Sequence, residues 1–510
     1  MASNHAEEWK EAMSSEMESL KKNNVFTVTK LPEGKKTIGS RWVYSIKDNP
    51  NGEVIHKARF VAKGYSQVEG SDYSETFSPT AKMSTVRMIM QVSAEEKLKV
   101  HHLDVKTAYL NAPIDCEVYI NQPEGFDVKK EGEKLVWKLN KSLYGLKQSG
   151  RNWNFVLSEF FQKHNLQKSD IDPCLFYKKN DTSKVYIVIW VDDIVLSASS
   201  QEELDKIKNL LKKEFQMKDL GTISYFLGIQ FKQDPITYTI EMSQSHYLKG
   251  VLQRFNMADC KPKSTPCEVK LQAYENEENK KSNDEDTRRY REIVGSLVYA
   301  MTCSRPDLAW IVTKLSQHLN NPTEADWITI KHVLRYIKGS LNHKLVFQKS
   351  KNGLETIGYS DSDWASSKED RKSTTGYCFM LNSEGPMISW KSKKQQTVAL
   401  SSCEAEYMAL TAATQEAIFL SNLAKEFGIV TDSPTHIYGD NQGSISLVKN
   451  PVNHEKTKHI DIKHHFVREK FSEGVIDVTY VPTSDNVSDL MTKPATKVKL
   501  DQFYQKLFGQ

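Results

Sequence analysis

The chain has 510 residues, enough for several domains, and its hydrophobic fraction of 39% supports packed cores. Its apolar runs are shorter than the ~20 residues of a membrane helix, which argues against a membrane protein. No charged-then-apolar leader opens the chain, so we expect no secretory signal. The formal net charge of +4 does not announce nucleic-acid binding, which would depend on local clusters of Lys and Arg.

The cysteine pattern argues against a disulfide framework and against a zinc ribbon. The seven cysteines are scattered, odd in number and without a Cys-x-x-Cys pair. This usage favours a reducing intracellular compartment. The cysteines are Cys116, Cys174, Cys260, Cys267, Cys303, Cys378 and Cys403.

Two early segments show clear periodicity. Apolar residues recur at helical spacing between positions 9 and 20, which predicts an amphipathic helix. Residues 41–46 alternate like a strand, and residues 54–62 would complete a β-hairpin across a turn at 48–52. Because its second half is basic, the hairpin could be a finger that contacts phosphates. The alternative is a solvated hairpin at a sheet edge. The basic residues are Lys57, Arg59 and Lys63.

Further along, residues 185–196 give a strand, an acidic turn and a second strand, followed by a helix from about 201 to 215. Residues 274–286 are almost wholly polar and predict a linker. Helices are expected over 291–316 and 324–338. After a polar break at 348–353, the pattern changes to strands, then helix, strand, helix and strand.

The acidic turn carries Asp192 and Asp193, and two adjacent like charges at the end of apolar strands repel each other. A bound cation would explain them, because Mg²⁺ takes one or two carboxylates together with substrate phosphates. Two such ions could promote an in-line phosphoryl transfer. Asp104 ends another strand-like segment and is the candidate third ligand. Taken alone, a strand-end Asp is more often a helix cap.

Several motifs around these acids resemble copia-type LTR-retrotransposon reverse transcriptases, in the order of that family. The similar segments are 57–64 (KARFVAKG), 102–111 (HLDVKTAYLN), 139–148 (LNKSLYGLKQ), 190–193 (WVDD) and 226–229 (FLGI). The resemblance covers nearly the whole chain after residue 8. It implies a right-hand polymerase with fingers, palm and thumb.

The resemblance also implies roles for individual residues. The metal ligands would be Asp104, Val105, Asp192 and Asp193, with two Mg²⁺ ions per active site and Mn²⁺ as a substitute, and Val105 would also contact the nucleotide. Tyr109 would be the steric gate against a ribonucleotide 2′-hydroxyl, although a core aromatic at a helix start is the alternative. The other implied nucleotide or template contacts are Lys57, Arg59, Lys63, Gly145 and Gln148. The implied primer contacts are Trp190, Leu227 and Gly228. Trp190 stands where the family has Tyr, so a contact from the Tyr hydroxyl is lost.

A second set of acids follows residue 353. Asp361 and Asp440 end predicted strands, Glu406 lies early in an Ala-rich helix, and Asp489 follows a strand and a polar turn. Acids on such elements can converge on one metal pair, although each alone could be a cap or a surface charge. The similar segments are 359–365 (YSDSDWA), 370–377 (DRKSTTGY), 389–395 (SWKSKKQ), 404–410 (EAEYMAL), 440–442 (DNQ) and 457–463 (TKHIDIK).

These segments resemble the copia-type ribonuclease H domain. The resemblance implies that Asp361, Glu406, Asp440 and Asp489 form a metal-dependent centre for hydrolysing RNA in an RNA–DNA hybrid. Asp363 and Glu404 are the runner-up choices. The hybrid contacts would include Lys391, Lys393 and Lys394, with a solvated face as the alternative. The loop 482–486 lacks the His that cellular ribonucleases H carry there, so product release would differ.

A zinc site among His454, His459, His464 and His465 is less favoured, since no cysteine joins them at finger spacing. A basic helix beside the hybrid fits this segment better.

The combined prediction is an α+β fold. It comprises fingers and palm over 1–270, an acidic linker with a helical thumb or connection over 271–350, and an α/β ribonuclease H-like domain over 351–510. The expected enzyme copies retrotransposon RNA into DNA. Its expected partners are an RNA template, a DNA primer, dNTPs, the RNA–DNA hybrid, and the integrase and capsid of the same element, but no membrane.

No protease or integrase pattern is visible, so we expect a polyprotein segment that acts in cytoplasmic virus-like particles or the nucleus. The rival hypotheses are a retired element protein kept for nucleic-acid binding or as a structural subunit, and a non-LTR or group II intron-type polymerase. The intact acids oppose the first rival, and the appended ribonuclease H-like segment opposes the second.

Overall fold

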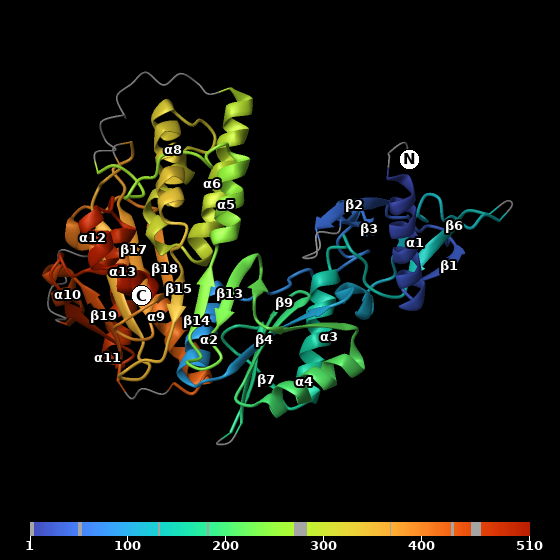
Figure 1. Ribbon diagram of the computed structural model, residues 1–510, viewed down its shortest axis with the longest axis horizontal. Coiled ribbons are helices and arrows are strands. Elements are labelled where there is room, and N and C mark those ends of the chain that lie inside the picture. The colour runs from blue at the N-terminus through green and yellow to red at the C-terminus, as the bar shows by residue number, and fades with distance from the viewer. Residues whose placement is uncertain are drawn as a thin grey trace. The chain divides into compact units, whose positions relative to one another are not determined.

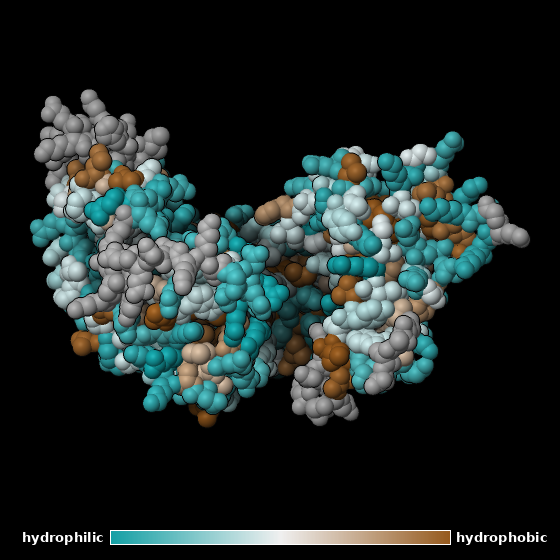
Figure 2. All heavy atoms as spheres, turned by 90° about the horizontal axis from the view of Figure 1, so that it is seen from above, coloured by the Kyte–Doolittle hydropathy of each residue, from teal (hydrophilic) through white to brown (hydrophobic). Residues whose placement is uncertain are grey.

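A computed structural model describes residues 5–48, 54–130, 133–180, 183–269, 283–367, 369–429, 433–449 and 461–510. Within these residues no helix is both long and apolar enough to cross a membrane. All seven cysteines are free thiols. The face shown in Figure 2 carries its hydrophobic residues as separate spots among hydrophilic ones.

The chain divides into two compact units, and each unit is built from separate stretches of sequence. Unit 1 comprises residues 1–81, 103–196 and 201–221, and unit 2 comprises residues 82–102, 197–200 and 222–510. This division into two units does not test the three domain boundaries expected from the sequence, which stay a prediction.

Unit 1 contains two small sheets and most of a six-stranded sheet, whose strand order is β11-β4-β10-β9-β8-β7. The small sheets have the orders β1-β6-β5 and β2-β3. The helices are α1 (Ala6–Lys22), η1 (Gly64–Ser66), η2 (Ala108–Asn111), α3 (Ser149–Lys163) and α4 (Gln201–Glu214). The strands are β1 (Phe26–Lys30), β2 (Ser40–Asp48), β3 (Val54–Ala62), β4 (Lys99–Val105), β5 (Tyr119–Ile120), β6 (Leu135–Leu139), β7 (Gln167–Lys168), β8 (Leu175–Lys179), β9 (Lys184–Trp190), β10 (Asp193–Ala198) and β11 (Met217–Thr222).

The structure confirms the predicted opening helix and basic hairpin. Helix α1 buries Met13, Met17 and Leu20, three of the apolar residues that gave its periodicity. Strands β2 and β3 pair in antiparallel register from Ser40↔Ala62 to Asp48↔Val54. The predicted turn lies mostly outside the described residues.

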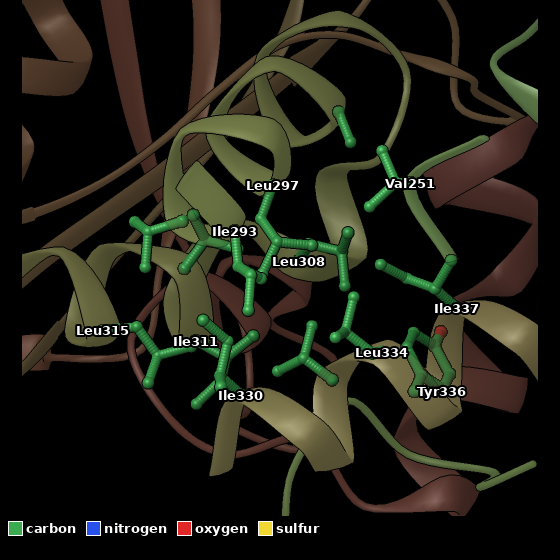
Figure 3. Close-up of a cluster of buried hydrophobic side chains, with 14 of the residues drawn as sticks. Val251, Ile293, Leu297, Leu308, Ile311, Leu315, Ile330, Leu334, Tyr336 and Ile337 are labelled. Carbon is green, nitrogen blue, oxygen red and sulfur yellow. The ribbon is translucent and has the colours of Figure 1, made fainter. Parts of the chain in front are cut away.

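In unit 2, helices α5, α6 and α8 stand together (Figure 1). Their shared core includes Val251, Leu297, Leu308, Leu334 and Ile337, which point toward one another in Figure 3. These elements are α2 (Met83–Glu95), α5 (Ser245–Arg254), α6 (Asp284–Cys303), η4 (Pro306–Leu308), α7 (Ala309–Leu315), η5 (Ser316–His318) and α8 (Glu324–Gly339). A sheet with the order β12-β13-β14-β15 lies in the same unit. Its strands are β12 (Tyr225–Phe226), β13 (Ile229–Gln233), β14 (Ile240–Ser243) and β15 (Leu345–Phe347).

The last part of unit 2 is a five-stranded sheet with the order β18-β17-β16-β19-β20. Strands β16, β17 and β18 are antiparallel neighbours, whereas β16, β19 and β20 run parallel. Helix α9 packs on β16 and β17, and it also contacts α10 and α11. The elements are β16 (Ile357–Asp363), β17 (Thr374–Met380), β18 (Met387–Lys394), α9 (Ser402–Glu426), β19 (Thr435–Gly439), α10 (Gln442–Lys449), α11 (Asp461–Ser472), β20 (Ile476–Tyr480), η7 (Val487–Met491), α12 (Lys497–Gln502) and α13 (Tyr504–Phe508). The predicted alternation of strands and helices after residue 353 is confirmed.

Two predicted boundaries shift. Helix α6 begins at Asp284, inside the predicted linker 274–286, because the Asn283 side chain accepts a hydrogen bond from the Asp286 amide and starts the helix there. Asp361 lies inside β16, opposite Gly376, and does not end the strand. Residues 274–282 of the predicted linker lie outside the described residues.

Candidate active sites

The first acidic centre lies at the ends of two adjacent strands. Asp104 is the penultimate residue of β4, while Asp192 and Asp193 lie where β9 turns into β10. The Val105 amide donates to the Asp192 carbonyl over 2.8 Å, which joins the end of β4 to this turn. The structure thus brings the three predicted acids to one place.

The turn before Asp192 is held in an uncommon conformation. Val191 has φ of +57°, a left-handed conformation that a β-branched residue rarely adopts. The buried Trp153 indole on α3 donates to the Val191 carbonyl over 2.6 Å. This bond fixes the turn, because the carbonyl belongs to the strained residue itself.

The charges of this centre act on one another. Burial raises the pKa of Asp192, and the neighbouring charges of Asp193 and Asp104 raise it further, whereas Arg59 lowers it. Burial and the charge of Asp192 also raise the pKa of Tyr109. Close carboxylates of this kind suit a divalent ion, since bound positive charge relieves their repulsion.

The basic residues of β3 line one face of the strand. Lys57 and Arg59 alternate with the buried Ala58, Phe60 and Ala62. The Arg59 guanidinium lies 5.0 Å from the centre of the Tyr144 ring, which in turn packs edge-on against Tyr109. Lys63 follows the strand, and its amide donates to the Gly39 carbonyl over 2.8 Å.

The segment around Gly145 packs closely on the end of β3. Gly145 has φ of +91°, and a Cβ there would lie 2.2 Å from the Ala62 carbonyl oxygen, so no side chain fits. Gln148 is buried, accepts a hydrogen bond from Gln67 over 3.0 Å and donates to the Asp72 carbonyl over 2.8 Å. These bonds give Gln148 a structural part, and its contact with a nucleotide stays a prediction.

The predicted primer contacts fall in separate units. Trp190 is the last residue of β9 in unit 1. Leu227 and Gly228 join β12 to β13 in unit 2, with φ of +53° and +73°. The Tyr299 hydroxyl on α6 donates to the Leu227 carbonyl and holds this bend.

The second acidic centre joins β16, α9 and the end of β19. Asp361, Glu406 and Asp440 each offer an oxygen, and these atoms all lie within 4.8 Å of one another. Among the described residues, this is the group of three acids found with the spacing of metal ligands. Three of the four predicted acids therefore meet as expected.

Asp361 is the buried member, with 1% of its surface exposed. One carboxylate oxygen, Oδ2, accepts a hydrogen bond from the Thr492 hydroxyl. The other, Oδ1, is buried without a hydrogen-bond partner among the described residues. Burial raises the pKa values of Asp361 and Glu406, and their mutual repulsion raises that of Glu406 further. A buried carboxylate oxygen beside two more acids fits a divalent ion.

Asp489 is not a member of that close group of three, and its carboxylate is paired with lysines. Lys493 Nζ lies 2.7 Å from Asp489 Oδ1, and Lys499 pairs with Oδ2. Thr483 adds a hydrogen bond of 2.6 Å to Asp440. These lysines and threonines were not predicted as site residues. For Lys493 the sequence did contain a signal, because it lies four residues after Asp489, a spacing typical of a helical ion pair.

The two runner-up acids have different surroundings. Glu404 accepts a hydrogen bond from the Leu400 amide over 2.7 Å, while its own amide donates to Ser401, so it caps α9. Asp363 ends β16 and lines a cleft of about 600 Å³ together with Asp489 and Lys493.

The predicted hybrid-binding lysines divide between the two faces of β18. Lys391 and Lys393 are exposed and share a face, because they are two residues apart on a strand. Lys394 is half-buried and pairs with Asp370 at 2.9 Å. His454 and His459 lie outside the described residues, and His465 lies on α11.

Comparisons with known proteins agree with this arrangement. Residues 23–269 match the family model described as reverse transcriptase (RNA-dependent DNA polymerase). The chain is 38% identical over 497 residues to the "Retrovirus-related Pol polyprotein from transposon TNT 1-94" of Nicotiana tabacum, covering 96% of this chain and 37% of that protein. It is 37% identical over 505 residues to the corresponding polyprotein from transposon RE1 of Arabidopsis thaliana, covering 98% of this chain and 34% of the relative.

The chain therefore spans about a third of the length of these curated relatives. A solved structure of a foamy viral protease-reverse transcriptase in complex with double-stranded DNA shares the fold, with a TM-score of 0.52 at 12% identity over 93% of this chain and 70% of that one. The predicted class, an α+β polymerase fold followed by a ribonuclease H-like domain, is confirmed. On these grounds the chain belongs to the copia-type reverse transcriptase family of retrotransposon Pol polyproteins.

Proposed function

We propose that this chain is an RNA- and DNA-dependent DNA polymerase that also hydrolyses the RNA strand of RNA–DNA hybrids. The observation that carries the polymerase activity is the meeting of Asp104 with Asp192 and Asp193, inside the region that matches the reverse transcriptase family. The acid group of Asp361, Glu406 and Asp440 supports the hydrolytic activity.

In the polymerase centre, Asp104, Asp192 and Asp193 would hold divalent ions, Mg²⁺ by preference. When bound, such ions supply positive charge for activating a primer 3′-hydroxyl and for stabilising leaving pyrophosphate. Arg59 is close enough to Asp192 to lower the pKa of that carboxyl. Its guanidinium would bind a triphosphate oxygen through charge-assisted hydrogen bonds.

Tyr109 is suited to a gate because its side chain is half-buried and close enough to Asp192 for the two charges to interact. It packs on Tyr144, whose stacking with Arg59 fixes the ring pair. We expect Tyr109→Ala to raise the use of ribonucleotides relative to deoxyribonucleotides in steady-state incorporation. Unchanged selectivity would remove this assignment.

In the hydrolytic centre, Asp361, Glu406 and Asp440 would hold a divalent ion that, when bound, supplies an activated water. The Thr492 and Thr483 hydroxyls hold Asp361 and Asp440 in place. The exposed Lys391 and Lys393 are available to the hybrid backbone. By extension, the natural partners would be the RNA template, the primer and the integrase and capsid of one element. Co-sedimentation with virus-like particles tests that setting.

The polymerase proposal is tested by primer extension with Mg²⁺ on RNA and DNA templates. Wild-type protein should extend the primer on both, and Asp192→Asn should abolish extension. The matched control is Asp205→Asn, which removes an exposed carboxylate on α4 and should extend normally. Absence of extension by wild-type protein would refute the proposal.

A further inference from the structure

Asp489 differs from the other acids of the hydrolytic centre in its partners. Both of its carboxylate oxygens face ammonium groups, Oδ1 that of Lys493 at 2.7 Å and Oδ2 that of Lys499. Only 4% of Asp489 is exposed, so its carboxylate has little contact with water and its charge is compensated mainly by these two lysines. Asp489 is thus held by the protein's own cations.

Lys493 reaches a second acid of the same centre. Its Nζ lies 3.6 Å from Asp361 Oδ2, the oxygen that also accepts the Thr492 hydroxyl. The Lys493 and Thr492 amides both donate to the Asp489 carbonyl, over 3.0 and 3.2 Å. The turn after η7 therefore fixes the backbone from which Lys493 bridges Asp361 and Asp489.

The contacts of Asp361 divide between its two oxygens. Oδ2 is engaged by Thr492 and Lys493, whereas Oδ1 is buried and has no hydrogen-bond partner among the described residues. Glu406 and Asp440 complete the close group with Asp361. Lys493 thus engages one oxygen of Asp361 and leaves the other without a hydrogen-bond partner among the described residues.

Charge balance points the same way. The four carboxylates of this centre, when ionised, carry four negative charges, and Lys493 and Lys499 offset two of them. Before a hybrid phosphate binds, one divalent cation neutralises the remainder, and a second would leave excess positive charge beside Lys493, where like charges repel.

We propose that the hydrolytic centre holds one divalent ion, at Asp361, Glu406 and Asp440, and that the Lys493 ammonium acts as its second cation. This inference rests on the proposed hybrid cleavage and replaces, for this centre, the two ions that the sequence resemblance implies. Lys493 also lines the cleft of about 600 Å³ beside Asp363, so its ammonium can meet a phosphate of the bound hybrid.

The direct test counts bound ions. The full chain carries Asp104→Asn, Asp192→Asn and Asp193→Asn, which remove the first acidic centre. It is bound to an RNA–DNA hybrid whose RNA is 2′-O-methylated and resists cleavage, and Mn²⁺ is titrated by calorimetry and electron paramagnetic resonance. We expect one magnetically isolated Mn²⁺ that is lost on Asp361→Asn.

Substitutions at Lys493 sharpen this count. Lys493→Met should admit a second, spin-coupled Mn²⁺, whereas Lys493→Arg should keep a single ion, because it keeps the charge. Lys497→Met is the matched control, since Lys497 is exposed and pairs with Asp501. A spin-coupled pair with Lys493 in place, or the same count after Lys493→Met, would overturn the inference.

Cleavage gives an independent readout. With the polymerase acids intact, Lys493→Met should raise the Mg²⁺ concentration for half-maximal hybrid cleavage by about tenfold and steepen its dependence, since a hydrogen bond to a charged group is lost. If Lys493→Met cleaves with the Mg²⁺ dependence of wild-type protein, the inference about Lys493 fails while the proposed hybrid cleavage stands. If wild-type protein cleaves no hybrid at any Mg²⁺ concentration, the proposed function fails, and the ion count still decides the role of Lys493.

Discussion

The two acidic centres differ in how the protein handles their charge. In the first, Asp104 near the end of β4 and Asp192 and Asp193 at the turn between β9 and β10 are half-buried, and a Trp153 hydrogen bond holds that turn by its backbone. In the second, Asp361 and Asp489 are buried, and lysines and threonines bind their side chains directly. Half-exposed acids can be neutralised by cations from solvent and substrate, but buried acids such as Asp361 and Asp489 need compensating charge from the protein itself.

Two acids of helix α9, Glu406 and Glu404, should differ most strongly in their importance for hybrid cleavage. Glu406→Gln should lower hybrid cleavage by about a thousandfold, a loss of the size seen when a group that stabilises transition-state charge is removed. Glu404→Gln should leave cleavage within about twofold and lower stability by about 1 kcal/mol, because it weakens a helix cap. Cleavage rates and urea unfolding of both variants measure this contrast. Equal loss of cleavage in both would place Glu404 in the centre as well.

An intermediate effect is expected at the turn of the first centre. Trp153→Phe removes the indole donor to Val191 while keeping an aromatic ring, so the strained turn loses its anchor. We expect primer extension to fall about tenfold, since a net hydrogen bond contributes on the order of 1 kcal/mol and the turn carries Asp192. Hybrid cleavage by the same preparation is the internal control. A parallel loss of cleavage would indicate general unfolding.

The smallest expected effect concerns stability and pH in metal-free protein. Burial raises the folded-state pKa of Glu406, so above the pKa of the unfolded chain, about 4.3, the folded state binds more protons and stability falls as pH rises. Glu406→Gln removes this penalty. The difference in Tm between Glu406→Gln and wild type should therefore grow in favour of the variant from pH 5 to pH 8. The expected size is roughly 2 to 4 °C for each kcal/mol of unfolding free energy that the variant regains.

Asp192→Asn is the comparison for that measurement. Burial also raises the pKa of Asp192, but this carboxyl is less deeply buried than that of Glu406, so the Tm of the Asp192→Asn variant should gain less. Differential scanning fluorimetry in EDTA at both pH values compares the variants. A Glu406→Gln variant that loses Tm relative to wild type as pH rises would reverse the sign and contradict the assigned burial.

The sequence predicted the acids better than their surroundings. Asp361, Glu406 and Asp440 could be chosen because each lies in a recognisable motif at a predicted strand or helix, and the fold brings them together. Lys499 could not, because nothing local shows that a residue ten positions after Asp489 returns to it. Glu404 could have been set aside, since Ser401 three residues before it matches a capping box.

Other parts needed the three-dimensional structure. The buried hydrogen bonds of Gln148 reach residues 67 and 72, which are far away in sequence. The αL conformation of Val191 had no signal either, because Val is a poor residue for positive φ, and the Trp153 hydrogen bond that holds it comes from a distant helix.

We expect the two acidic centres of this chain to act independently of each other. The most direct measurement is a single reaction with Mg²⁺ on an RNA template, in which the DNA primer and the RNA carry different labels and both products are followed. Asp192→Asn should cut the RNA without extending the primer, and Glu406→Gln should extend the primer without cutting the RNA. Loss of both products together in either variant would show that the two centres are not separable.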